Sequence, residues 1–595
     1  MKNISYRKVE LSDGYWRDKQ ELNKNVTIHA VYDRFSETGR IGAFRFDYKP
    51  EDERCPHFYW DSDVAKWIEG VAYILNKQSS PILEQRVEEL IDLIEKNQCE
   101  DGYFNIYFTV VKPELRFTDR DMHELYCAGH LIEAAVAYAE ATGRTRFLTC
   151  MEKYVDLIAK VFMQEHSAAF STPGHEEIEL ALIRLYRYTG KKKYLELSEY
   201  FINARGVAKE PFMDAQIQSH LPVRQQRSVV GHSVRAMYLC AAIAALVKEN
   251  GDEELFDTCR ALWEDTTTRK MYVTGGVGST NIGEAFTTPY DLPNDAAYTE
   301  TCASIGLVLF ANAMQELSLD STYADVIERA LYNGILSGLS ASGDSFFYEN
   351  PLEINRSERF SNCFGKRSLP LMQRPKMFNC SCCPPNLNRL IPSIGSYLFG
   401  KDEDTLYVHQ YTGATLNDGP LQARMETNYP QSGSVRLCVR GVSRVALRIP
   451  GWCSRVKINL PYEMKNGYAV VENSGEILLE MDMTPRKVWA DVQVIRDAGR
   501  VAIMRGPIVY CAESVDNGEN LHRLSIPTDA EIRVCPSGSF GLPELQVDAV
   551  EHYRDSSALY NSTPPSARPF VLRMIPYNSF ANRGECDMMV WFLTQ

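Results

Sequence analysis

The chain has 595 residues, of which 45% are hydrophobic, 11% aromatic and 24% charged. This composition is typical of a folded globular protein and excludes a disordered chain. With 64 basic and 78 acidic residues the formal charge is −14, so no nucleic-acid partner is expected. The longest apolar run, 236–247, is shorter than the about 20 residues that span a membrane, so no membrane partner is expected either.

The N-terminal segment lacks the apolar stretch of a secretory signal, because charged residues interrupt it from Lys2 onward. We therefore expect a cytoplasmic protein. Its 16 cysteines are too sparse for a disulfide scaffold. Clustered cysteines in a reducing compartment more often bind a metal or take part in catalysis.

The first two thirds of the chain are predicted to form paired helices. Three stretches with apolar residues at helical spacing each stop at a glycine, the usual C-cap, and another helical stretch follows after a short charged link. These glycines are Gly143, Gly190 and Gly251. Two more helix–turn–helix links are expected near 76–81 and 319–323. Repeated helical hairpins predict an α-solenoid or a closed α/α toroid, and a toroid with a central cavity suits an enzyme better.

After about Leu398 the pattern changes to short alternating or β-branched runs, separated by turns such as 417–419. This pattern is typical of β-sandwiches, and we predict two of them. The predicted domains are an N-terminal strand segment at 1–9, a helical catalytic domain at 10–398, β-sandwiches at 399–500 and 501–575, and C-terminal strands at 576–595 that return to a sandwich.

The densest chemical signal is the segment 380–386, in which Cys380, Cys382 and Cys383 lie within four positions. Thiolates are strong zinc ligands, and adjacent cysteines do not easily form an unstrained disulfide with each other. The segment therefore indicates a zinc site. A purely structural zinc, or three buried thiols that behave as small apolar residues, remain alternatives.

A second signal is Glu300-Thr-Cys302. Residues two apart do not share a helical face, so two ligands at this spacing belong on an extended loop or in the first turn of a helix. Together with Cys382 and Cys383 they would complete a four-ligand site. The alternative is that Glu300 is a helix cap or a salt-bridge partner.

The glycine-rich segment 275–286 ends in Glu284-Ala-Phe. It lacks the Gly-Lys-Ser/Thr of a phosphate-binding loop and does not fit a dinucleotide fingerprint. We interpret it as a flexible active-site loop that presents Glu284. A solvated glutamate without a function is the alternative.

Three histidines lie near expected helix starts, where the helix ends of a toroid would surround one mouth. They are His123, His175 and His232, and together they favour a polar pocket for a hydroxyl-rich ligand. Each alone could be a capping or core histidine. Asp61-Ser-Asp63 is a weaker signal that simple N-capping would explain.

These motifs resemble those of glycoside hydrolase family 127, the β-L-arabinofuranosidases. The combination of Glu-x-Cys and Cys-Cys is highly specific, and the resemblance spans nearly the whole chain. A neighbouring family, 146, shares this plan. The resembling segments are 174–181, 269–274, 283–284, 290–295, 300–304, 380–386, 448–452 and 504–510.

The resemblance implies an (α/α)6 barrel followed by two jelly-roll-like β-sandwich domains. It implies an exo-acting, retaining hydrolase that releases L-arabinose from the non-reducing end of β-L-arabinofuranosides. The substrate would be an arabinofuranosyl oligosaccharide or glycoconjugate. The oligomeric state stays open, a homodimer included.

By position, the resemblance also implies the roles of individual residues. Cys382 would be the nucleophile, Glu284 the general acid/base, and Cys363 and Cys380 have no assignable role. The implied Zn²⁺ ligands are Glu300, Cys302, Cys382 and Cys383. The implied sugar-pocket residues are His123, His175, His232, Glu328 and Tyr348.

Most retaining glycosidases use two carboxylates, whereas here a thiolate would replace one of them. A metal or a positive neighbour lowers the pKa of a cysteine thiol, so the thiolate exists at neutral pH. Glu300 is the rival nucleophile, but coordination would already occupy its carboxylate. Two other readings are a carbohydrate-binding or scaffold protein with a structural zinc, and another toroid enzyme such as a lyase or an epimerase.

Overall fold

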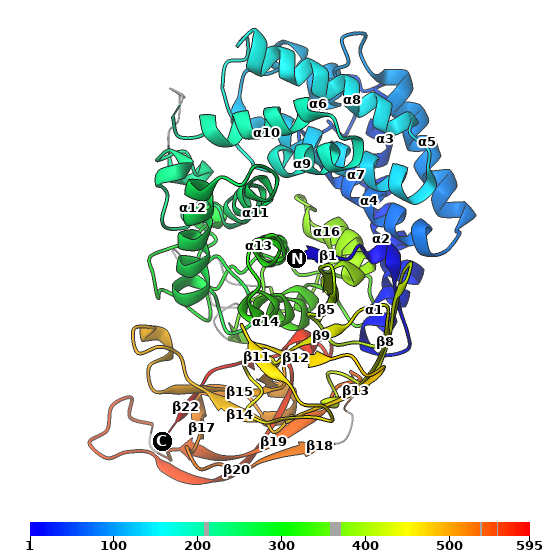
Figure 1. Cartoon of the computed structure of the whole chain (residues 1–595). Coiled ribbons are helices and arrows are strands. Elements are labelled where there is room, and N and C mark those ends of the chain that lie inside the picture. Colours follow the sequence, from blue (N-terminus) through cyan, green and yellow to red (C-terminus); the bar gives the residue numbers. More distant parts are fainter. Residues whose placement is uncertain (208–213, 357–370, 536–537, 539, 556, 595) are drawn as a thin grey trace.

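The computed structural model describes residues 1–207, 214–356, 371–535, 538, 540–555 and 557–594. A large helical domain comes first and a β-rich domain packs against one side of it (Figure 1). Among the helices described, none combines the length and the apolar character needed to cross a bilayer. Cys363, for which the sequence suggested no role, lies outside the described residues.

Six helices of the described chain contact one another in cyclic order and form a closed ring, with outer helices packed around it (Figure 1). The inner helices are α4 (Trp60–Lys77), α7 (Glu124–Thr142), α9 (Ile178–Thr189), α11 (Ser233–Asn250), α13 (Thr301–Leu317) and α16 (Cys383–Leu390). The outer helices are α2 (Ile28–Glu37), α5 (Pro81–Asn97), α8 (Arg146–Ala159), α10 (Lys192–Ala204), α12 (Glu253–Asp265) and α14 (Ser321–Arg329). Shorter helices are α1 (Tyr15–Leu22), α3 (Arg40–Ala43) and α6 (Tyr107–Val110).

Burial distinguishes the two layers as the sequence patterns require. The inner helix α11 is buried at every position from Ser233 to Val247, because neighbours surround it. The outer helix α12 buries only one stripe, which includes Leu255, Cys259 and Leu262. The three predicted glycine stops are confirmed, since the C-caps of α7, α9 and α11 are left-handed glycines.

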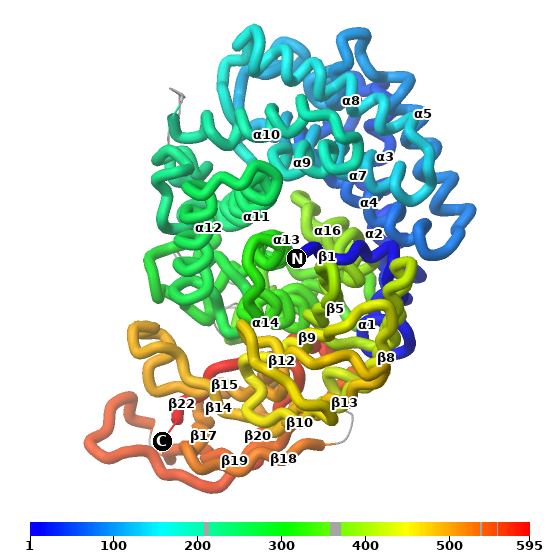
Figure 2. The backbone as a smooth tube through the Cα atoms, viewed as in Figure 1, coloured from blue at the N-terminus to red at the C-terminus, as the bar shows by residue number. Residues whose placement is uncertain are grey.

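The inner helices all begin at the same mouth of the ring, because inner and outer helices alternate along the chain. Residues at or just before their N-terminal ends line one cavity. Residues from their C-terminal halves, such as Tyr73 and Asn312, line a different cavity at the opposite mouth. The N-terminal residues 3–6 also line that second cavity, and the N-terminus appears beside α13 and α16 (Figures 1 and 2).

A buried ion network ties the ring together between its two mouths. Glu69 of α4 pairs with Arg184 of α9 at 2.8 Å and with Arg389 of α16 at 2.9 Å. Burial by itself would raise the pKa of Glu69, but the two guanidinium groups lower it to about 2. Replacing Glu69 would leave the buried Arg389 without this ion pair, and breaking a buried pair in this way typically costs about 3–5 kcal/mol.

The β-rich part contains three sheets among the described residues. The first has the order β1-β4-β5-β9-β12-β11, the second β10-β13-β8-β7-β6-β2, and the third contains ten strands. The strands of the first two sheets are β1 (Lys2–Asn3), β2 (Val9–Leu11), β4 (Phe399–Lys401), β5 (Thr405–Val408), β6 (Ala414–Asp418), β7 (Leu421–Thr427), β8 (Ser434–Arg440), β9 (Arg444–Arg448), β10 (Val456–Ile458), β11 (Glu463–Lys465), β12 (Tyr468–Glu472) and β13 (Glu476–Met481).

The third sheet gathers strands from distant parts of the chain. Its members are β3 (Glu353–Ile354), β14 (Arg486–Val488), β15 (Arg500–Arg505), β16 (Ile508–Glu513), β17 (Leu524–Ile526), β18 (Ile532–Cys535), β19 (Glu544–Tyr553), β20 (Ser566–Pro576), β21 (Met588–Met589) and β22 (Phe592–Thr594). The last two strands therefore return to this sheet. Strand β14 pairs with β15, although the predicted border at 500 separates them.

The N-terminal strands join sheets that are otherwise built from residues after 398. β1 pairs with β4, and β2 pairs with β6. The chain thus starts in the first two sheets, enters the helical ring and returns to the same sheets. This connection ties the N-terminus to both domains, which the local sequence of residues 1–11 does not reveal.

Asp61 and Asp63 lie in the first turn of α4, but neither caps that helix, so the capping interpretation is wrong. Asp63 pairs with the buried Arg40 at 2.9 Å. One carboxyl oxygen of Asp61 accepts the backbone N–H of Ile106 at 3.0 Å, and the other is buried without a partner. Burial raises the pKa of Asp61 to about 7.

Asp61→Asn is expected to stabilise the protein increasingly as the pH rises. The Asp61 carboxyl group ionises near pH 4 in the unfolded chain, whereas in the folded chain it stays neutral until about pH 7. The free energy of unfolding of the native protein therefore falls by up to roughly 4 kcal/mol across this window. Asparagine keeps the acceptor and does not ionise. Thermal unfolding of both proteins from pH 4 to 8 should show a difference that grows up to pH 7. The exposed Asp33→Asn is the control, and a pH-independent difference would contradict the assignment.

Candidate active site and metal centre

A polar cavity opens at the N-terminal mouth of the helical ring. Residues predicted for the pocket come together there from five inner helices and two loops, although they are far apart in the sequence. The cavity is lined by Tyr59, Ser62, Asp63, His123, Tyr126, His175, His232, Val234, Glu284, Glu300, Cys302, Tyr348, Cys380 and Cys382.

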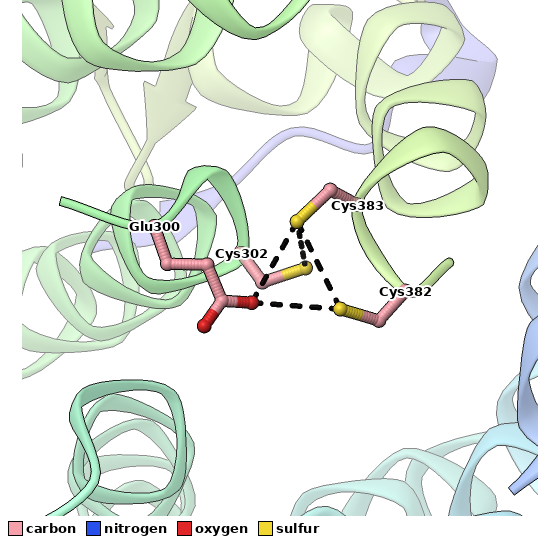
Figure 3. Close-up of side chains that lie close together, drawn as sticks. All are labelled: Glu300, Cys302, Cys382 and Cys383. Atoms are coloured by element: carbon pink, nitrogen blue, oxygen red, sulfur yellow. Dashed lines mark hydrogen bonds between the residues drawn. The ribbon is translucent and has the colours of Figure 1, made fainter. Parts of the chain in front are cut away.

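Glu300, Cys302, Cys382 and Cys383 form one cluster at the wall of this cavity (Figure 3). One ligand atom from each lies within 4.8 Å of the others. The Sγ atoms of Cys302 and Cys383 are 3.4 Å apart, and those of Cys382 and Cys383 are 3.8 Å apart. Glu300 Oε1 lies 3.5 Å from Cys382 Sγ and 3.6 Å from Cys383 Sγ.

These distances fit a single metal ion at the centre of the cluster. A tetrahedral zinc with Zn–S bonds of about 2.3 Å holds two sulfurs about 3.8 Å apart. Glu300 Oε2 is buried without a hydrogen-bond partner, as expected of a carboxylate that lacks its cation. Burial, and then the charge of Cys382, raise the pKa of Glu300 well above its usual range, so a positive ion would relieve this site.

Two helix N-termini position the cluster. Glu300 is the N-cap of α13 and Cys302 lies in its first turn, which confirms the expectation for two ligands at this spacing. Cys382 is the N-cap of α16 and Cys383 is its first residue. The positive ends of both helices therefore face the sulfurs and favour thiolates.

Glu284 reaches the cavity from the glycine-rich loop. Its backbone φ is 56° and that of Gly283 is 70°, so the tight turn needs the left-handed region at both positions. The loop was predicted to be flexible, yet β-bridges hold it at both ends, including one between Ala285 and His232. Because the loop is held at both ends, it presents the Glu284 carboxylate in one direction.

The Glu284 carboxylate receives hydrogen bonds from two neighbours. His232 Nε2 lies 2.6 Å from Oε2, and Tyr298 Oη lies 2.6 Å from Oε1. Burial alone would raise the pKa of Glu284, but these donors and the charge of Arg235 hold it below its ordinary value. The resting carboxylate is therefore ionised at neutral pH.

The three predicted histidines lie side by side, with ring centroids 5.5 Å apart from His123 to His175 and from His175 to His232. Burial lowers the pKa of all three, so they are neutral at neutral pH. His123 and His175 direct Nδ1 at backbone carbonyls, which leaves Nε2 as an acceptor. His232 accepts the Val234 N–H at Nδ1, so its Nε2–H is a donor.

Tyr348 connects the acid/base candidate with the thiol cluster. Its Oη lies 3.3 Å from Cys382 Sγ and 3.5 Å from Glu284 Oε1. The structure thus brings Tyr348 into the pocket together with the three histidines, Glu284 and Cys382.

The prediction that Glu328 lines the sugar pocket is wrong. Glu328 lies on the outer helix α14 and is buried against the β-rich domain. Its carboxylate pairs with Arg448 at 2.6 Å, and it accepts hydrogen bonds from Tyr429 at 2.6 Å and from Trp452 at 2.9 Å. These contacts occupy both oxygens, so Glu328 joins the domains and does not face a sugar.

Several pocket residues escaped the sequence analysis. Tyr126 lies three residues after His123, so helical spacing could have revealed it. Tyr298, which donates to Glu284, lies only two residues before Glu300. Tyr59 lies just before α4, and no local motif marks it as a pocket residue, whereas Asp63 belongs to the weaker Asp61-Ser-Asp63 signal and does line the cavity.

Comparisons with known proteins agree with this geometry. Residues 8–396 match the family description "Beta-L-arabinofuranosidase, GH127 catalytic domain", residues 405–478 the GH127 middle domain, and residues 485–593 the family 127 C-terminal domain. The chain is 36% identical to a non-reducing end β-L-arabinofuranosidase of Bifidobacterium longum subsp. longum, over 91% of this chain and 90% of that protein.

Two solved structures are also similar over almost their whole length. A GH127 β-L-arabinofuranosidase from Geobacillus stearothermophilus T6 has 41% identity and a TM-score of 0.92, covering 99% of this chain and all of that one. Another GH127 β-arabinofuranosidase has 31% identity and a TM-score of 0.90, covering all of this chain and 98% of that one. With a carboxylate and a thiol cluster in one pocket, and with family matches across all three regions, the chain belongs to glycoside hydrolase family 127.

Proposed function

We propose that the protein is an exo-acting, retaining hydrolase that releases L-arabinose from the non-reducing end of β-L-arabinofuranosides. Cys382 is the nucleophile and Glu284 is the general acid/base. The similar proteins with this printed activity support the substrate class. We assign the helical ring as an (α/α)6 barrel and the sheets as two jelly-roll-like sandwiches, which are finer descriptions of the fold above.

The position of Tyr348 between Cys382 and Glu284 carries this proposal. Both reactive groups contact the same hydroxyl, at 3.3 Å and 3.5 Å, so they cannot be further apart than the sum of these distances. This limit is compatible with the about 5–5.5 Å between the two catalytic groups of retaining glycosidases. The substrate's anomeric carbon would lie between them.

In the first step, Cys382 Sγ attacks the anomeric carbon and the glycosidic C–O bond breaks. Glu284 gives its proton to the departing oxygen. In the second step, Glu284 takes a proton from water, the water oxygen attacks the anomeric carbon, and the C–S bond breaks. Two inversions restore the original configuration.

Glu284 must be protonated for the first step, although its resting neighbours favour the carboxylate. The hydrogen bond from His232 Nε2 is the first of the interactions that lower its pKa. A sugar hydroxyl that takes this hydrogen bond would weaken that stabilisation and raise the pKa of Glu284. Substrate binding would thus prepare the acid, and the transfer of its proton to the departing oxygen would leave Glu284 as the base for the second step.

Glu300, Cys302, Cys382 and Cys383 would hold one Zn²⁺ ion, because sulfur-rich tetrahedral sites suit zinc better than magnesium or calcium. When bound, zinc would keep the Cys382 thiol deprotonated at neutral pH and fix its direction. The histidines of the pocket would orient the sugar, since His123 and His175 offer acceptors to hydroxyl groups.

Purified protein is expected to contain about one zinc per chain, and Cys302→Ser should lose most of it, because serine supplies no thiolate. Elemental analysis after dialysis measures this directly. Cys259→Ser, a buried thiol of α12 outside the cluster, is the matched control. Native protein without zinc, or a Cys302→Ser variant that keeps its zinc, would contradict the site.

A panel of aryl glycosides tests the substrate assignment. The aryl β-L-arabinofuranoside should be hydrolysed at least about 100-fold faster than the α-L-arabinofuranoside or a pentopyranoside, because a pocket built for one ring and anomer misplaces the others. The alternative of a carbohydrate-binding or scaffold protein with a structural zinc is not supported, since the chain belongs to a hydrolase family. An unsaturated sugar product would instead indicate a lyase. The cytoplasmic location stays a prediction, and the oligomeric state stays open.

A further inference from the structure

Cys380 is a pocket thiol that the proposed mechanism does not use. It lines the cavity beside Cys382, and both are partly exposed, whereas Cys302 and Cys383 are buried. Tyr348 Oη lies 3.3 Å from Cys382 Sγ and 3.9 Å from Cys380 Sγ, so both sulfurs lie close to the same hydroxyl group.

We propose that Cys380 and Cys382 form a disulfide bond when the protein meets a hydroperoxide. The bond would occupy the Cys382 sulfur, remove one of the four metal donors and switch the site off reversibly. Its effect on activity rests on the proposed role of Cys382, whereas the bond itself does not.

The local backbone suits this bond. The chain bends at Asn379 and Cys380 before α16 begins. Residues two apart on a bent segment lie within the about 4.4–6.8 Å between Cα atoms that a disulfide spans. Arg40 Nη2 and Tyr59 Oη both donate to the Asn379 carbonyl, at 2.7 Å and 3.2 Å, so the segment is anchored next to the two thiols.

The chemistry needs only the peroxide as oxidant. The Cys382 thiolate attacks one peroxide oxygen, the O–O bond breaks, and hydroxide leaves, which gives a sulfenic acid. The Cys380 sulfur then attacks the Cys382 sulfur and the S–O bond breaks. The thiol proton and the leaving hydroxide form water, so two thiols are oxidised while the peroxide is reduced.

Two other pairings of the cluster are less suitable. Cys302 and Cys383 lie 3.4 Å apart, yet both are buried, so peroxide reaches them less easily. Cys382 and Cys383 lie 3.8 Å apart, but they are adjacent in sequence, and a disulfide between neighbours is strained. Cys380 is therefore the expected resolving partner.

The test treats the zinc-loaded full chain with hydrogen peroxide, alkylates the remaining free thiols and maps the peptides. We expect one peptide that contains Cys380 and Cys382 with the loss of two hydrogen atoms and no alkylation at either sulfur. Zinc release, followed with a chromogenic chelator, and loss of activity should accompany this change. A thiol reductant with added zinc should restore both.

Cys380→Ser provides the decisive comparison. Without a resolving thiol, Cys382 should be oxidised further to the sulfinic acid. The fraction of starting activity that the reductant restores should then be at least about tenfold smaller for the variant than for the native protein. Cys438→Ser, which removes a partly exposed thiol of β8 away from the pocket, should behave as the native protein.

A disulfide mapped to Cys302–Cys383 or Cys382–Cys383, or full recovery of Cys380→Ser, would overturn the proposal. Peroxide inactivation of native protein without any disulfide would overturn it as well. A mapped Cys380–Cys382 bond in a fully active enzyme would support the bond and contradict Cys382 as the nucleophile, so the two failures are distinguishable.

Discussion

Glu284→Gln is expected to lower kcat/KM about 10³-fold for a β-L-arabinofuranosyl disaccharide, because general acid/base catalysis typically contributes about 10²–10⁴-fold. Glutamine preserves the shape and can still contact His232 and Tyr298, which hold the native carboxylate. An aryl glycoside with a good leaving group should lose less in the first step, since its oxygen departs without a proton. The comparison of the two substrates is measured by initial rates.

Azide supplies a second readout for the same variant. It attacks the intermediate without needing a general base, so it should restore turnover of the aryl substrate and yield a glycosyl azide of retained configuration. Glu264→Gln, on the exposed face of α12, is the matched control and should leave rates and azide response unchanged. A Glu284→Gln enzyme with near-native rates on the disaccharide would rule out this acid/base.

Cys382→Ser is expected to reduce activity about 10⁴-fold or more, since loss of a catalytic nucleophile typically has an effect of this size. The same change also removes a thiolate from the metal cluster, so the activity loss does not by itself separate the two roles. Zinc content must therefore be measured on the same sample.

Covalent trapping separates the nucleophile from the ligand. An arabinofuranose-configured cyclophellitol-type epoxide or haloacetamide should label Cys382 of the native enzyme, as mapped by peptide mass spectrometry. Labelling of Glu300 would move the nucleophile to the carboxylate and leave the thiol as a ligand only. An inverted product, seen by NMR early in turnover, would exclude both, because inversion uses direct attack by water.

Local sequence signals defined the helical elements well. Glycine caps and apolar periodicity located the ends of α7, α9 and α11, because a left-handed C-cap is a property of a few adjacent residues. The spacing of Glu300 and Cys302 likewise predicted an extended loop or a helix's first turn, and the structure has the second of these. The strand-rich half and its turn at 417–419 were also visible, because alternation and turn residues act over short distances.

Other features depend on contacts between distant segments. The return of β1 and β2 to later sheets follows from strand partners hundreds of residues away, so no local pattern encodes it. Glu328 shows the consequence for function. The family resemblance implied a pocket residue, whereas Arg448 and Trp452 of the β-rich domain bind its carboxylate.

The sequence by itself determined the helical and strand-rich parts and the residue types of the candidate metal site, because periodicity, caps and thiol clusters are local. Only the tertiary structure decided which of these residues meet. The ring closes through contacts between α4 and α16, and this closure brings Cys382 to Tyr348, Glu284 and the row of histidines. It likewise decided that Glu284 is held as a carboxylate, since its donors His232 and Tyr298 come from different segments.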